Sequence, residues 1–142
     1  MKILVTGVKG QLGYDVVKEL TGRGIEALGV DIDEMDITDP VSVDKVIREA
    51  APDAVIHCAA YTAVDAAEEN EELCRRVNAE GPGKIARGCK ELDIKMIQIS
   101  TDYVFSGEGT RFWKPEDVCE PQSVYGRTKY EGELAVREIW DK

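Results

Sequence analysis

The chain has few of the features that mark secreted, membrane-spanning or metal-binding proteins. No apolar run approaches the roughly 20 residues that cross a bilayer, and no basic region followed by a long apolar stretch opens the sequence. The four cysteines are scattered without a C-x-x-C pair, and there is one histidine. We therefore expect a cytoplasmic protein with reduced thiols and without a bound metal.

Basic residues are also scarce, because 18 Lys and Arg oppose 28 Asp and Glu and leave a formal net charge of −10. This charge disfavours nucleic acid or anionic lipid as a partner, so a phosphate ligand needs backbone donors and a few local cations. The length is 142 residues, of which 43% are apolar and 32% charged. These values are typical of one globular domain, which we expect to span residues 1–142.

The opening stretch, residues 1–20, has the pattern of a buried strand, a glycine turn and an amphipathic helix. Residues 2–5 are an apolar run, glycines follow at positions 7, 10 and 13, and apolar residues recur at every fourth position from Leu12. Unpaired backbone N–H groups at the start of such a helix bind phosphate. The spacing G-x-x-G-x-x-G differs from the dinucleotide fingerprint G-x-G-x-x-G and also fits an ordinary loop. Its place between a strand and a helix favours nucleotide binding.

A second strand pattern, residues 25–30, ends at Asp31. A carboxylate at this point can accept hydrogen bonds from the adenosine ribose and repels a 2′-phosphate, which favours NAD over NADP. Asp33 is the competing candidate, and a solvated acidic turn is the alternative interpretation.

Strand and helix patterns alternate along the rest of the chain. Strands are predicted over 54–60 and 95–100, and helices after Pro40, over 66–91 and over 125–140. This alternation predicts an α/β fold, a doubly wound parallel sheet of the Rossmann type. His57 falls inside a strand, where we expect a packed core residue, and residues 106–122 are predicted to be irregular.

Tyr125 and Lys129 lie four residues apart, on one face of the last predicted helix. A nearby ammonium lowers the pKa of a phenol, and a phenol so tuned can exchange a proton with a carbonyl or alcohol oxygen. Thr101 or Ser100, at the end of the preceding strand, could hydrogen-bond the same oxygen. Such Tyr–Lys pairs are also frequent on helix surfaces, so the pair indicates a catalytic role only together with the other motifs.

Five segments together resemble one family: TGVKGQLG (6–13), MDITD (35–39), AAYTAVDAAE (59–68), STDYVFSG (100–107) and VYGRTKYEGE (124–133). On these segments the sequence resembles the extended short-chain dehydrogenase/reductases that act on nucleotide sugars. The resemblance implies a nicotinamide cofactor, NAD(H) or NADP(H). It also implies reduction of the 4-keto group of a dTDP-linked sugar, which gives dTDP-L-rhamnose.

The resemblance also implies roles for single residues. Tyr125 would be the general acid, Lys129 would tune Tyr125 and hold the nicotinamide ribose, and Thr101 would orient the carbonyl. Thr62 and Val64 would lie near the sugar. The other residues implied at the cofactor are Gly7, Gly10, Gln11, Leu12, Gly13, Asp31, Asp36, Ile37, Ala59, Ala60 and Tyr61.

Members of this family are about twice as long and carry a C-terminal substrate domain. We therefore expect a fragment in which that domain is absent, from a protein that forms a homodimer. Two alternatives stay open: a non-catalytic NAD(P)-binding regulatory subunit, and an epimerase or dehydratase acting on another nucleotide sugar. Dehydratases commonly add two acids after the threonine position, whereas here Asp102 is followed by Tyr103.

Overall fold

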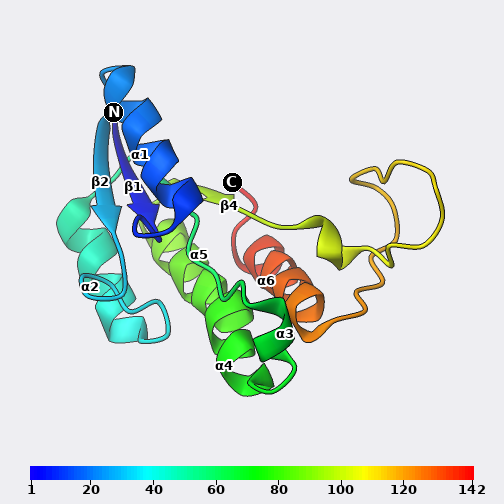
Figure 1. The fold of residues 1–142 in the computed structure, drawn as a ribbon. Helices are drawn as coiled ribbons and strands as arrows, with labels where there is room; N and C mark the ends of the chain where they lie inside the picture. Colours follow the sequence, from blue (N-terminus) through cyan, green and yellow to red (C-terminus); the bar gives the residue numbers. More distant parts are fainter.

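The computed structural model describes residues 1–142, and its centre is a parallel sheet of four short strands (Figure 1). The strands are β1 (Lys2–Thr6), β2 (Glu26–Val30), β3 (Ala54–His57) and β4 (Lys95–Gln98), in the order β2-β1-β3-β4. Each neighbouring pair is parallel. The core against this sheet is apolar, and its fully buried members include Leu4, Ile47, Val55 and Ile85.

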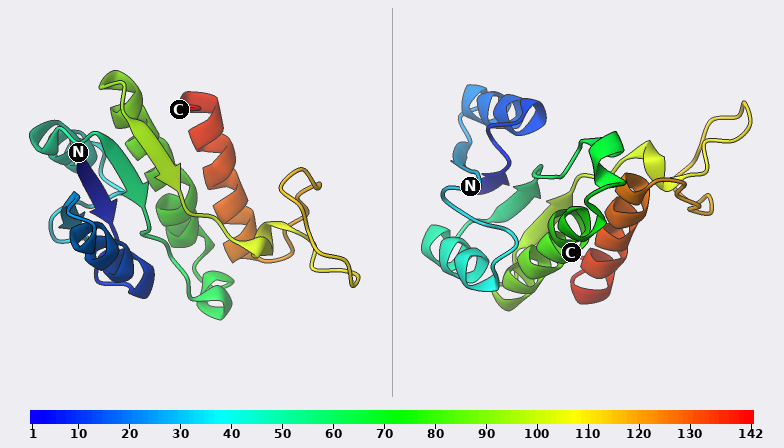
Figure 2. Two further views of the ribbon diagram at one scale, coloured as in Figure 1. Left: turned by 90° about the horizontal axis from the view of Figure 1, so that it is seen from above. Right: turned by 60° about the horizontal axis from the view of Figure 1, so that its bottom comes forward.

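Helices cover the two faces of the sheet unequally (Figure 2). The helix α1 (Gln11–Gly22) lies alone on one face, against β1 and β2. The helices α2 (Pro40–Ala50), α5 (Gly81–Glu91) and α6 (Val124–Ile139) form a layer on the other. Helices on both faces of a parallel sheet confirm the predicted doubly wound, Rossmann-type architecture.

The connections reverse direction at the middle of the sheet. From β1 the chain passes through α1 to β2 on one side, and from β2 it returns through α2 to β3 on the other side of β1. The carboxyl ends of β1 and β3 therefore diverge at a topological switch point, which is where sheets of this type form a crevice.

The helix predicted over residues 66–91 is not continuous. The chain forms α3 (Val64–Ala67), α4 (Glu71–Arg75) and a π-helical turn η1 (Arg76–Glu80) before α5. Between α3 and α4, Asn70 leaves the helical region at φ −132°, and the Glu68 carboxylate accepts a hydrogen bond from the Val124 amide at 2.8 Å. This contact with the start of α6 fixes the turn, which local sequence pattern could not anticipate.

Other boundaries differ by fewer residues. The strands predicted over 54–60 and 95–100 stop at His57 and Gln98. Beyond them the Ala59 amide donates to the Thr6 hydroxyl, and the Ile99 carbonyl accepts from the Lys129 ammonium. On α1, Leu12 is 45% exposed and Gly13 is the buried residue. Residues 106–122 form no helix or strand, as predicted. All four cysteines are free thiols, and no helix combines the length and apolar character needed to cross a bilayer.

Candidate nucleotide-binding and catalytic site

The turn after β1 lies directly against the end of β3. Gly7 has φ +72°, and a Cβ added there would come within 2.7 Å of the Ala59 amide nitrogen and Cα. The Gly7 amide donates to the Val30 carbonyl at 2.9 Å, and Gly10 donates back to the Gly7 carbonyl at 3.1 Å. Only glycine satisfies both the left-handed backbone and the close approach, so the first glycine of the motif is required by the fold of this turn.

A buried pair beneath the turn holds the two strand ends together. Thr6 Oγ1 and His57 Nδ1 lie 2.7 Å apart, and Thr6 Oγ1 also accepts a hydrogen bond from the Ala59 amide at 3.2 Å. Burial, with a smaller effect of the Lys129 charge, lowers the pKa of His57 to about 3. His57 is thus a neutral, hydrogen-bonded core residue, as predicted.

Two adjoining cavities follow the carboxyl edge of β1 and β3. One of about 450 Å³ runs along the glycine turn, and one of about 240 Å³ lies between the ends of β1 and β2. Gly7, Asp31, Ala59 and Ala60 line both cavities, so they form one continuous cleft. The remaining predicted residues that line it are Gly10, Gln11, Leu12, Gly13, Asp36, Ile37 and Thr62.

Carboxylates surround the end of the cleft near β2. Asp31 Oδ2 accepts from the Lys9 amide and Oδ1 from the Ile32 amide, each at 2.9 Å. The Lys9 ammonium pairs with Asp33. Asp36 Oδ1 accepts from the amide and the hydroxyl of Thr38, each at 2.8 Å, and these bonds lower the pKa of Asp36. This end of the cleft is therefore negatively charged at neutral pH.

Lys129 is the buried cation at the same edge of the sheet. Its side chain is 3% exposed, and Nζ donates to the Ile99 carbonyl, just beyond β4, at 2.5 Å. Burial lowers the pKa of Lys129, and the charge of the Glu133 carboxylate acts in the opposite direction. The bond to the Ile99 carbonyl places the ammonium at the carboxyl edge of the sheet, the edge that also carries the cleft.

Tyr125 lies in the first turn of α6, one turn before Lys129. Ser123 caps this helix by accepting from the Gly126 amide at 3.0 Å. The Tyr125 ring meets Tyr103 edge to face at 5.5 Å, and both Tyr125 and Tyr61 pack against the small cluster of Ala67, Cys74 and Val124. The Tyr125 side chain is half-buried.

Thr101 follows β4 and caps the short turn η2 (Asp102–Val104). Its hydroxyl accepts from the Tyr103 amide at 3.3 Å and donates to Asp102 Oδ1 at 3.2 Å. Thr101 and Tyr125 are thus linked through Tyr103, which contacts both.

The structure does not bring every predicted residue to the cleft. Tyr61, Val64, Thr101, Tyr125 and Lys129 lie outside the lining of its two cavities. Sequence reasoning missed other residues that do line it, among them Lys9, Met35, Cys58 and Val77. Cys58 could have been found from its place at the end of a predicted strand. Val77 belongs to η1, and only the packing of η1 against the sheet brings it to the cleft.

The chain is an α/β protein of the Rossmann type. Three features define this class: a parallel sheet whose strand order reverses beside its first strand, a glycine turn at that reversal, and a cleft over the strand ends. The comparison with protein families is more specific. The chain belongs to the family described as RmlD substrate binding domain, whose model matches residues 1–142.

Similar proteins agree with this assignment. The dTDP-4-dehydrorhamnose reductase of Mycobacterium tuberculosis is 42% identical over 139 residues, which cover 95% of this chain and 45% of that protein. A crystal structure of a dTDP-4-dehydrorhamnose reductase from Clostridium acetobutylicum has a TM-score of 0.95 at 44% identity and covers 98% of this chain. One from Bacillus anthracis in complex with NADP has a TM-score of 0.96 at 36% identity and covers 99%. The match spans 50% of each of these two solved chains.

This chain therefore spans about half the length of the curated relatives it matches.

Proposed function

We propose that this chain supplies the cofactor-binding and catalytic groups of a dTDP-4-dehydrorhamnose reductase, which reduces the 4-keto group of dTDP-4-dehydro-L-rhamnose with a nicotinamide cofactor. The observation that carries the proposal is the close approach of Gly7 to Ala59, which both line the cleft. The buried Lys129 lies at the same edge of the sheet. The whole residue range 1–142 is proposed to act as one dinucleotide-binding domain.

The N-terminus of α1 is suited to hold the cofactor pyrophosphate. Its N-cap residue, Gly10, offers no side chain, so the amides of the first helical turn have no capping partner. Such amides, at the positive end of the helix dipole, bind phosphate oxygens. We assign the pyrophosphate to the turn and first helical residues Gly7, Gly10, Gln11, Leu12 and Gly13.

The rest of the cofactor follows the cleft in both directions. The adenosine is assigned to the end near Asp31, Asp36 and Ile37, where the smaller cavity lies. The middle of the cofactor is assigned to Ala59, Ala60 and Tyr61. The sugar of the substrate is assigned to the adjoining loop, at Thr62 and Val64.

The proposed reaction is a hydride and proton addition to a carbonyl. A bound reduced nicotinamide supplies the hydride to the sugar C4. Tyr125 donates its phenolic proton to the C4 oxygen, and the Lys129 ammonium stabilises the phenolate that remains and holds the nicotinamide ribose. The Thr101 hydroxyl turns from Asp102 to donate a hydrogen bond to the same C4 oxygen.

We propose that NADH is preferred over NADPH. A 2′-phosphate would enter the end of the cleft where Asp31 lies, and the Lys9 ammonium in the cleft lining is paired with Asp33. Glu34, which accepts from the Asp31 amide at 2.9 Å, adds a third carboxylate. Titration by nicotinamide fluorescence should give a dissociation constant about tenfold lower for NADH than for NADPH, given charge repulsion at this range. Equal or tighter NADPH binding would contradict the preference.

The reductase proposal is tested by Tyr125→Phe in the natural full-length gene product. The variant keeps the aromatic ring and loses only the phenolic hydroxyl, so turnover of the dTDP-4-keto sugar should fall by about 10²–10⁴-fold, the usual contribution of a general acid. NADH binding should stay within a factor of two or so of the wild type, because the phenol makes no part of the pyrophosphate turn. Retained turnover would remove Tyr125 from its role.

A cytoplasmic location and a homodimer complete the proposal. The free state of all four thiols suits a reducing compartment. Sedimentation equilibrium of the purified protein tests the homodimer, and a monomer at high micromolar concentration would contradict it.

A further inference from the structure

Two neighbouring residues of the sheet carry buried side-chain atoms that have no hydrogen-bond partner within the chain. These atoms are His57 Nε2 and Gln98 Oε1. The two residues are register partners on β3 and β4, so their side chains leave the sheet on the same face. It is the face covered by α5, because Val55, two residues before His57, packs there in the core with Ile85. Buried polar atoms are nearly always paired, so this pair of atoms requires a further partner.

The hydrogen bonds of His57 determine which of its ring nitrogens carries the hydrogen. Thr6 Oγ1 already accepts from the Ala59 amide, and the acceptor for its own hydrogen is His57 Nδ1, 2.7 Å away. A neutral imidazole has one N–H group, and burial keeps His57 neutral. The hydrogen is therefore assigned to Nε2, which makes Nε2 a donor.

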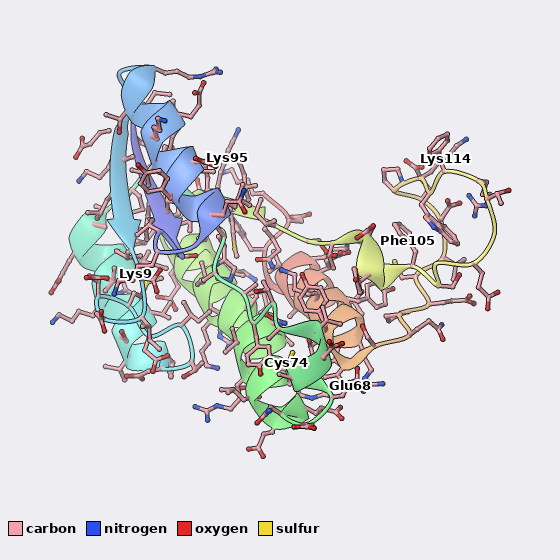
Figure 3. All side chains as sticks on the ribbon, viewed as in Figure 1. Lys9, Glu68, Cys74, Lys95, Phe105 and Lys114 are labelled. Carbon is pink, nitrogen blue, oxygen red and sulfur yellow. The ribbon has the colours of Figure 1, made fainter.

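The carboxamide of Gln98 is oriented by a backbone carbonyl. Its Nε2 donates to the Ile99 carbonyl at 3.3 Å, and because a carbonyl only accepts, Oε1 cannot take that place. The same carbonyl accepts from Lys129 Nζ at 2.5 Å. It belongs to the segment between Lys95 and Phe105, which leaves β4 and runs past α6 (Figure 3). Gln98 and Lys129 thus share one acceptor at the end of β4.

The two unpaired atoms are complementary, since one is a donor and the other an acceptor, but they do not bond each other. Adjacent strands lie about 4.8 Å apart, and a water with two bonds of about 2.8 Å joins groups roughly 4.5–5.5 Å apart. A water can accept from the one atom and donate to the other. Buried waters typically satisfy polar groups of this kind.

We propose that His57 Nε2 and Gln98 Oε1 together bind one enclosed water molecule, and that Gln98, held by this water, is a positioning residue for Lys129. The water accepts from His57 and donates to Gln98 Oε1, which keeps the Gln98 amide directed at the Ile99 carbonyl. That carbonyl in turn holds the Lys129 ammonium.

The bridge completes a row of hydrogen bonds across the carboxyl ends of three strands. The row starts at the Ala59 amide, beside the glycine turn, and passes through Thr6, His57, the water and Gln98 to the carbonyl that holds Lys129. The positioning role rests on the proposed reductase function, whereas the water site does not.

The first test is an NMR measurement on the ring nitrogens of His57 in this chain, which has no other histidine. We expect Nε2 to carry the hydrogen. We also expect this hydrogen to show a cross-peak to a water molecule that exchanges slowly with the solvent. A hydrogen on Nδ1, or an Nε2 hydrogen without contact to water, would overturn the proposal, and both results come from the unaltered protein.

Gln98→Met tests whether the carboxamide completes the water site. Methionine has a similar length and no strong acceptor, so the Nε2 hydrogen of His57 should lose its water cross-peak and exchange at least about tenfold faster. Gln122→Met, the same substitution at an exposed position after η2, is the matched control and should change neither. A water cross-peak that persists in Gln98→Met would show that Gln98 does not hold the water.

The second test measures turnover in the full-length gene product. Gln98→Met leaves the Ile99 carbonyl with one of its two donors and should lower kcat about tenfold, because small displacements of a catalytic group are costly. Gln122→Met should leave kcat unchanged. An unaltered kcat in Gln98→Met would overturn the positioning role.

The same substitution in a Lys129→Met background separates positioning from general damage. If Gln98 acts through Lys129, Gln98→Met should cause no further loss of the residual kcat there, since the group that it positions is gone. A purely structural residue would lower kcat by the same factor in both backgrounds, and that result would refute the positioning role. Full-length wild type without turnover of the dTDP-4-keto sugar would refute the proposed function and the positioning role together. The ring hydrogen of His57 and its water contact would then still decide the water site.

Discussion

At the scale of single residues, the neutral state of His57 has a measurable consequence. Its imidazole is buried, its Nδ1 lies 2.7 Å from Thr6 Oγ1, and its Nε2 has no hydrogen-bond partner within the chain. Protonation would therefore place an uncompensated charge in the interior.

The pKa of His57 is lowered to about 3 in the folded state, from 6.5 in the unfolded chain. The unfolded chain thus binds more protons between these values, so stability is complete above pH 6.5 and is lost as the pH falls toward 3. Between pH 6.5 and 5 the free energy of unfolding should fall by about 1.5 kcal/mol. Because the chain has one histidine, its ring NMR signals should not titrate between pH 8 and 5. A ring pKa near 6.5 would contradict the prediction.

Some site residues could be predicted because the sequence pattern that identifies them spans only a few residues. The spacing of Tyr125 and Lys129 places both on one helix face wherever that helix lies. The partner that Lys129 actually bonds, the Ile99 carbonyl, depends on where α6 docks, and no local pattern reveals it. The register that sets Gln98 beside His57 could not be predicted for the same reason, since it depends on how β3 and β4 pair.

At the scale of elements, α6 lies unusually close to its neighbours. Gly126 faces the Tyr103 carbonyl and Gly132 faces the Asn78 carbonyl, so two glycines of one helix meet backbone atoms of other segments. A glycine inside a helix is unfavourable by itself, and here close helix approach compensates for it.

Replacement of Gly132 by alanine should therefore destabilise the protein despite the better helix propensity of alanine. The added methyl group must push α6 away from η1, a type of overpacking that costs about 1–3 kcal/mol. Gly22→Ala is the matched control, because it lies at the end of α1 with no atom within 4 Å of the added Cβ. Thermal unfolding should show a fall of several degrees for Gly132→Ala and no fall for Gly22→Ala. Equal melting temperatures would refute the close-packing argument.

The interruption of the helix predicted over 66–91 belongs to this scale as well. Residues 66–91 have a continuous helical pattern, and within it Gly81 lies against Ile37, whose Cδ1 an added Cβ would approach to 3.1 Å. The turn at Asn70 and the π turn at Arg76–Glu80 arise from contacts with α6. Tertiary contacts overrode local propensity at both places.

At the scale of the whole molecule, the cleft follows from chain topology. The strand patterns, their alternation with helices and the glycine turn together predict a doubly wound sheet, and that sheet requires a crevice at its reversal point. The length of each strand and the depth of the cleft could not be predicted, since they depend on how Thr6, His57 and Ala59 bond across the sheet.

The central claim is that this cleft holds a nicotinamide dinucleotide. Its most direct test is an NADH titration of this chain followed through backbone amide shifts, with Gly7→Ala as the matched variant. We expect saturable shifts concentrated at residues 7–13, 31–37 and 59–61. We expect their loss in Gly7→Ala, whose Cβ would overlap Ala59. Absent shifts, shifts on another face of the sheet, or undiminished binding by Gly7→Ala would contradict the claim.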